Sequence, residues 1–145
     1  MTPDEDDRLI SIRPGFADAI FKGTKTVEVR RKIPQISSGI RLWIYVTKPV
    51  GEVRGVARVA EIVEGDPNAL WSACGPRTGL SRSEFNDYFS GSAKAYGLVL
   101  QDVIIGQPAP IEALRALRAG FHPPQVITRL TTAETKRLHR HLFPA

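Results

Sequence analysis

Alternating apolar and polar positions indicate several short strands along the chain, and one of the clearest is the segment KTVEVR at residues 25–30. Because successive side chains of a strand point to opposite faces, Val27 and Val29 share one face, while Glu28 and Arg30 share the other. The valines are expected to join the core. The charged face is expected to line a different surface, and it is the first indication of a functional site.

The same alternation predicts further strands. The segment RLWIYVTKP at 41–49 carries bulky residues on both faces, so both faces are expected to be covered. GEVRGVARVAEIVEG at 51–65 indicates a long strand with a turn at Gly51 and a bulge at Gly55. KAYGLVLQDVII at 94–105 indicates a return strand, which the prolines after it are expected to end.

Capping signals place short helices between these strands. After a first short strand, Pro14 suits the first position of a helix that Gly23 ends. Asp66, followed by a proline, indicates the start of a second helix. The capping boxes SRSE at 81–84 and TTAE at 131–134 indicate two more.

Strands at fairly regular spacing, with short helices between them and no long βαβ rhythm, predict an α+β fold. We expect a small, mostly antiparallel β-barrel with flanking short helices and a basic C-terminal helix. A short helix at 111–120 should precede the final one. The length fits a single domain over residues 1–145.

Positive charge is concentrated in two blocks of the sequence. The formal net charge is +5, and residues 22–58 carry nine Lys and Arg against two Asp and Glu. Residues 115–145 carry six against one. If the fold brings the blocks together, they form a surface suited to a phosphate backbone. The alternative is a solvated basic face without a partner.

Other residue types exclude several kinds of site. The single Cys74 forms no internal disulfide, and no apolar segment of signal-peptide or membrane-span length is present, so we expect a cytoplasmic protein without a membrane partner. His139 and His141 are two apart on a predicted helix and diverge, so neither a metal nor another cofactor is expected. GPRTGLS at 75–81 lacks the spacing of a phosphate-binding loop and is interpreted as a connection between helices.

Three segments together resemble the ASCH domain, a branch of the PUA-like barrels. They are SIRPGFADAIFKGTKTVEVRR, LWIYVTKPVGEVRGVARVAEIVEG and LWSACGPRTGLSRSEFNDYFSGSAKAYGLVL. The family's glycine and lysine before an extended E-x-R correspond to Gly23, Lys25, Glu28 and Arg30. The resemblance spans about residues 8–106, the expected barrel, and leaves 107–145 as a helical extension packed on it. PPQ at 123–125 is similar to tails found in some ASCH proteins.

The resemblance implies a cleft, beside the first helix and the KTVEVR strand, that accepts RNA or a nucleotide. Arginine can pair with phosphate through two hydrogen bonds, whereas lysine acts as a point charge. Glu28 would either accept hydrogen bonds from a base or hold Arg30 in place. Trp43 and Tyr96 are further aromatic candidates for base stacking, although Trp43 is better suited to the core. The candidate ligand-binding residues are Lys25, Glu28, Arg30, Arg31, Tyr45, Arg137 and Arg140.

A small hydrolase, either a ribonuclease or an amidohydrolase acting on modified cytidine, is the alternative function. Enzymes among the ASCH proteins carry a threonine three residues after a lysine of lowered pKa, and here that position is Glu28. Hydrolysis would therefore use Lys25 with Thr24 or Thr26, or a carboxylate base such as Glu28 or Glu61. A third hypothesis is a binding module that recruits a protein partner through the C-terminal tail.

Overall fold

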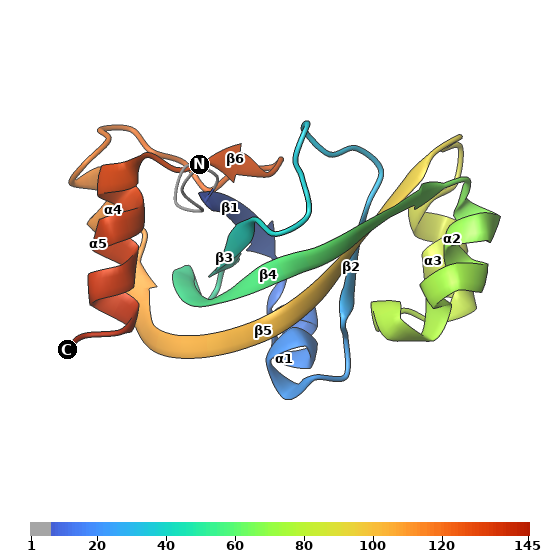
Figure 1. The fold of residues 1–145 in the computed structure, drawn as a ribbon, viewed down its shortest axis with the longest axis horizontal. Coiled ribbons are helices and arrows are strands. Elements are labelled where there is room, and N and C mark those ends of the chain that lie inside the picture. The colour runs from blue at the N-terminus through green and yellow to red at the C-terminus, as the bar shows by residue number, and fades with distance from the viewer. Residues whose placement is uncertain (1–6) are drawn as a thin grey trace.

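A computed structural model describes residues 7–145, and in it one sheet of six strands is flanked by short helices (Figure 1). The strands are β1 (Asp7–Ile12), β2 (Val27–Arg30), β3 (Arg41–Val46), β4 (Glu52–Gly65), β5 (Ala95–Pro110) and β6 (Thr128–Arg129). The helices are α1 (Pro14–Lys22), α2 (Pro67–Cys74), the 3₁₀ turn η2 (Gly75–Thr78), α3 (Arg82–Tyr88), α4 (Glu112–Arg115) and α5 (Thr132–Leu142). The predicted α+β class is confirmed.

The sheet is open. Its strand order is β2-β5-β4-β3-β1-β6, and all neighbours pair antiparallel except β1 and β3, which are parallel. The edge strands β2 and β6 lie at opposite ends of this order, and within residues 7–145 no ladder joins them. The mostly antiparallel sheet is therefore confirmed, whereas closure into a barrel is not.

Three hydrophobic clusters cover the sheet. The α1 cluster consists of Ile10, Ile12, Ala17, Ile20, Ile40, Leu42, Ile44, Val46, Ala57, Val59, Leu98, Leu100 and Ile127. The α5 cluster consists of Leu9, Trp43, Tyr45, Val53, Val56, Ala109, Ile111, Leu114, Phe121, Leu130, Leu138 and Leu142. The α3 cluster consists of Val27, Val29, Leu70, Cys74, Phe85, Phe89, Ala95 and Val99. Alternate residues of β3 enter the α1 and α5 clusters, so both of its faces are covered, as its sequence predicts.

Local signals place the ends of several elements correctly. Gly23 adopts a left-handed φ of 86° and ends α1, and both capping boxes, at Ser81 and at Thr131, are formed. The pairing of β4 shifts register beside Gly55, where a Cβ atom would lie 2.8 Å from the carbonyl oxygen of Ile104. The close approach of the two strands explains why glycine occupies this bulge.

Two predicted boundaries are wrong. Strand β5 continues to Pro110 instead of stopping before Pro108. Strand β2 pairs only with Tyr96 to Val99, so the later part of β5 has a ladder partner on one side only, namely β4. Proline is tolerated at such a sheet edge because its missing N–H can face away from the partner strand. Helix α4 covers only Glu112–Arg115, so the helix predicted at 111–120 is much shorter than its sequence indicates.

The C-terminal segment is attached to the sheet by apolar contacts. Leu138 and Leu142 of α5 are buried in the α5 cluster, beside Trp43 and Val53. Removing residues 111–145 would therefore expose core side chains of β3 and β4. Within the described residues no helix combines the length and apolarity needed to cross a bilayer.

Candidate functional site

A cleft of about 890 Å³ opens where β1, α1, β2 and α3 meet. Its lining residues are Ser11, Arg13, Phe16, Lys25, Glu28, Val29, Arg30, Arg31, Thr47, Leu80, Glu84, Asp87, Tyr88, Pro123, Pro124 and Gln125. Because β1 and β3 are parallel, their carboxyl ends lie next to each other at the same end of the sheet. This places Thr47 beside Ser11 and Arg13. Four residues of the predicted site, Lys25, Glu28, Arg30 and Arg31, line this cleft.

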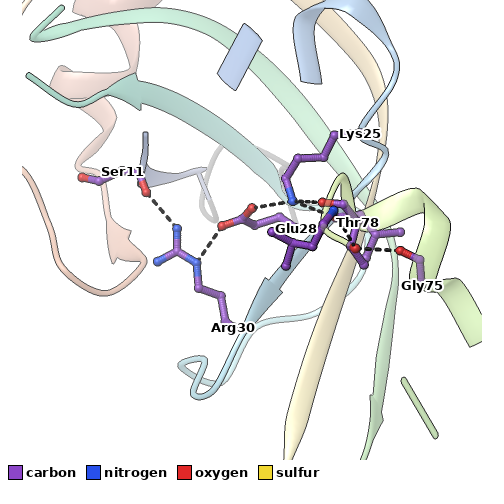
Figure 2. A network of polar contacts seen from close by, with 8 residues as sticks. Ser11, Lys25, Glu28, Arg30, Gly75 and Thr78 are labelled. Atoms are coloured by element: carbon purple, nitrogen blue, oxygen red, sulfur yellow. Dashed lines mark hydrogen bonds and ion pairs between the residues drawn. The ribbon is translucent and has the colours of Figure 1, made fainter. Parts of the chain in front are cut away.

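Lys25 is buried at the inner end of the cleft, with 2% of its surface exposed. Its Nζ donates hydrogen bonds to the carbonyl oxygens of Val27 at 2.9 Å and Thr78 at 2.6 Å. The same nitrogen lies 3.3 Å from Oε1 of Glu28 (Figure 2). An ammonium group has three N–H donors, so these three acceptors occupy all of them.

The turn that follows α1 explains how Lys25 reaches this position. After the left-handed Gly23, the backbone N–H of Lys25 bonds back to the carbonyl of Ala19, so Lys25 precedes β2 instead of opening it. The opposite wall comes from η2. Thr78 is fully buried, and its hydroxyl donates to the carbonyl of Gly75, which fixes the carbonyl that Lys25 contacts. The GPRTGLS segment thus connects two helices, as predicted, and also holds the lysine.

Glu28 links Lys25 to Arg30. Its Oε2 accepts a hydrogen bond from Nε of Arg30 at 2.9 Å, and Nη2 of Arg30 donates to the carbonyl oxygen of Ser11 at 2.8 Å (Figure 2). The ion pair that the sequence left as one alternative for Glu28 is therefore present. The Arg30 side chain keeps 16% of its surface exposed, so its guanidinium group remains accessible from the cleft.

Burial lowers the pKa of Lys25 below its usual 10.5, and the attraction of Glu28 opposes this effect only in part. We expect the Cε resonance of Lys25, followed by NMR, to report a pKa below 10.5. In a Glu28→Gln variant it should titrate lower still, because the opposing charge is gone. Between the lowered pKa and 10.5 the unfolded chain binds more protons, so the contribution of Lys25 to the unfolding free energy rises with pH there. A measured pKa of Lys25 at or above 10.5 would contradict the expected effect of burial.

Aromatic and charged groups form the rim. The guanidinium carbon of Arg31 lies 4.7 Å from the ring centroid of Tyr88, and Nζ of Lys25 lies 5.3 Å from that of Phe16. Both distances are typical of cation–π contacts. Glu84 and Asp87 on α3 are exposed on the same rim. The cleft therefore combines cationic groups with two aromatic rings, and its acidic groups lie at the α3 side and beside Lys25.

The other candidate groups for hydrolysis lie outside the cleft lining. The Thr26 hydroxyl accepts a hydrogen bond from Nε of Arg77 at 3.0 Å, and that of Thr24 donates to the carbonyl of Ala19 at 3.2 Å. Glu61 is exposed on β4. Of the proposed partners for Lys25, only Glu28 contacts it.

Tyr45 is not in the cleft either. It is 2% exposed and lies in the α5 cluster with Trp43, and burial raises the pKa of its hydroxyl. A ring enclosed in this way has no free face for a base, so the prediction that Tyr45 stacks on a ligand is wrong. Trp43 is fully buried and its indole N–H donates to Asp7, as expected of a core residue.

Helix α5 lies at one end of the molecule, whereas β2 lies nearer its middle (Figure 1). Residues of β2 line the cleft. Arg137 and Arg140 belong to α5, and they do not line the cleft. The part of the C-terminal segment that does reach it is the PPQ sequence at 123–125. No Lys or Arg of residues 115–145 lines the cleft, so the structure does not join the two basic blocks of the sequence there.

Several cleft residues escaped the sequence analysis. Arg13, Phe16, Thr47 and Tyr88 line the cleft, and none of them is among the site residues predicted from the sequence. The parallel pairing of β1 with β3 would have pointed to Arg13 and Thr47, but a parallel pair was not foreseen. Among the described residues there is no group of three His, Cys, Asp or Glu side chains that could hold a metal ion.

The open, mostly antiparallel sheet with flanking short helices is the fold found in solved ASCH structures. The ASCH domain model matches residues 10–104, and the chain belongs to this family. It is 44% identical over 136 residues to the "ASCH domain-containing ribonuclease" of Zymomonas mobilis subsp. mobilis, covering 94% of this chain and 92% of that protein.

Solved structures agree with this assignment. The crystal structure of ASCH from Zymomonas mobilis superposes with a TM-score of 0.88 at 43% identity, covering 92% of this chain and 94% of that one. The N-terminal domain of Staphylothermus marinus McrB has a TM-score of 0.58 at 11% identity, over 92% of each chain, and shares the fold.

Proposed function

We propose that this protein is a ribonuclease, which binds RNA in the cleft and cleaves it there. The observation that carries the proposal is that Arg13, from the start of α1, lines the same cleft as Lys25, Arg30 and Arg31, from in and around β2, and that the carboxylate of Glu28 contacts both Lys25 and Arg30. The 44% identity to a protein named as a ribonuclease, over nearly the full length of both chains, supports cleavage as well as binding.

Phosphate binding follows from the arrangement of the arginines. Arg30 uses Nε and Nη2 for contacts within the protein, which hold its guanidinium plane fixed at the cleft. A guanidinium group held in this way loses little rotamer freedom when it binds a phosphate. Arg13 and Arg31 are exposed at the rim and add charge along the backbone of the ligand.

Cleavage would use the 2′-hydroxyl of the RNA as nucleophile. Each carboxylate oxygen of Glu28 makes one contact, with Lys25 or with Arg30, but a carboxylate oxygen has two lone-pair sites and so can still accept a proton. Glu28 takes the proton of the 2′-hydroxyl, the 2′-oxygen bonds to phosphorus, the bond from phosphorus to the 5′-oxygen breaks, and that oxygen takes a proton from solvent. The products are a 2′,3′-cyclic phosphate and a 5′-hydroxyl. Arg30 stabilises the charge on the phosphate oxygens as the bond to the 2′-oxygen forms.

The amidohydrolase alternative has less support. It requires Lys25 to activate a hydroxyl, but Nζ of Lys25 is hydrogen-bonded to two carbonyl oxygens and paired with Glu28. The hydroxyls of Thr24 and Thr26 are engaged elsewhere. An assay with acylated cytidine is therefore expected to show no turnover.

The proposal is tested with a short fluorescent RNA and the same RNA carrying a single 2′-deoxy substitution. We expect binding to weaken steeply as salt rises, because several phosphates are contacted, and we expect cleavage at the substituted position to disappear while binding stays. A protein that binds no RNA at low salt, or that cleaves the deoxy site equally well, would overturn the proposal.

A further inference from the structure

A second groove, of about 750 Å³, adjoins the cleft. Its lining residues are Arg30, Arg31, Lys32, Tyr88, Gly91, Ser92, Ala93, Lys94, Tyr96, Gln125 and Val126. Four of these residues, namely Arg30, Arg31, Tyr88 and Gln125, line the cleft as well. The two hollows are therefore neighbours, and they share these four residues at the end of β2.

Like the cleft, the groove is lined by cationic and aromatic side chains. Tyr96 is half-buried on β5 and lies opposite Arg30 in the pairing of β2 with β5. Lys32 is exposed beside it, and Lys94, also exposed, is paired with Glu64 at 3.0 Å. Glu64, the partner of Lys94, belongs to β4 and does not line the groove. An aromatic ring beside exposed cationic side chains, here those of Arg31 and Lys32, is an arrangement that can hold a base and its phosphate.

We propose that this groove is a second nucleotide subsite, in which Tyr96 stacks on a base and Lys32, with Arg31, contacts the adjoining phosphate. The inference rests on the proposed function and adds its substrate class, which is single-stranded RNA that spans the cleft and the groove. Bases in a duplex are already paired and stacked, so only an unpaired base can lie against a ring inside a groove. A mononucleotide would fill the cleft alone.

The test measures how affinity depends on RNA length. Uncleavable 2′-O-methyl oligouridylates of two and six nucleotides are bound to the protein, and fluorescence anisotropy gives both affinities. Wild type should bind the hexanucleotide more tightly. Tyr96→Leu should lose roughly 5- to 150-fold of affinity for the hexanucleotide, the usual effect of removing one stacking ring, and little for the dinucleotide. Tyr96→Phe keeps the ring and should retain the wild-type preference.

Each outcome identifies which proposal fails. A hexanucleotide preference that Tyr96→Leu leaves unchanged overturns the subsite and leaves the ribonuclease proposal standing. A preference that depends on Tyr96 in a protein without cleavage activity supports the subsite and overturns cleavage. A wild-type protein that binds neither oligonucleotide overturns both. A hairpin duplex that binds as tightly as the single strand would overturn the substrate class.

Discussion

A protein in which Glu28 is replaced by glutamine is expected to cleave RNA about 10²- to 10⁴-fold more slowly, the usual contribution of a positioned general base. Glutamine keeps the size of the side chain and one oxygen acceptor toward Lys25 or Arg30, but it cannot take the proton of the 2′-hydroxyl. Affinity for uncleavable RNA should change only a few-fold. Single-turnover cleavage and anisotropy binding, measured on the same preparation, separate the two effects.

Glu84→Gln is the matched control. Glu84 lies on the rim of the same cleft, but its carboxylate closes the capping box of α3 with Ser81, a role that glutamine also fills. Its cleavage rate should stay within about threefold of wild type. If Glu28→Gln retains the wild-type rate, Glu28 serves only to hold Lys25 and Arg30, and the base must be sought elsewhere.

Replacing Lys25 by methionine is expected to lower the unfolding free energy by about 2 to 4 kcal/mol. The carbonyls of Val27 and Thr78 lose their donor, and the buried Glu28 loses one of its two cationic partners. Methionine has a similar length, so the effect reports the ammonium group rather than a cavity. The loss corresponds to about 6 to 12 °C in Tm for a chain of this size, which calorimetry or denaturant unfolding resolves.

Lys136→Met provides the comparison, because Lys136 is exposed on α5 and should change the free energy by less than about 0.5 kcal/mol. The double variant of Lys25→Met with Glu28→Gln should lose less than the sum of the single variants, since the unpaired carboxylate is no longer present. Strict additivity would show that the contact between Nζ of Lys25 and the Glu28 carboxylate contributes nothing to folding.

The local pattern of the sequence was sufficient to predict which residues of β2 face the core and which face away from it. Alternation alone placed Val27 and Val29 in the core and turned Glu28 and Arg30 away from it, and the structure has both valines in the α3 cluster and both charges in the cleft. Capping signals were equally reliable, because a cap depends on residues only a few positions apart.

Long-range contacts were beyond the reach of such patterns. The carbonyl of Thr78 that holds Lys25 is 53 positions away, and nothing in the sequence of the η2 turn indicates that it accepts from a lysine. Alternation also groups Trp43 with Tyr45 without saying what covers their face. That face lies under α5 and not beside the cleft, which is why Tyr45 was misassigned.

The segment that carries Pro123 and Pro124 is anchored on both sides of the sheet. Phe121 at its start is buried in the α5 cluster, and Ile127 after it is buried in the α1 cluster, on the opposite face. A short, proline-containing span between two buried anchors has little freedom to swing away. A ligand that enters the cleft would therefore not first have to order this part of its wall.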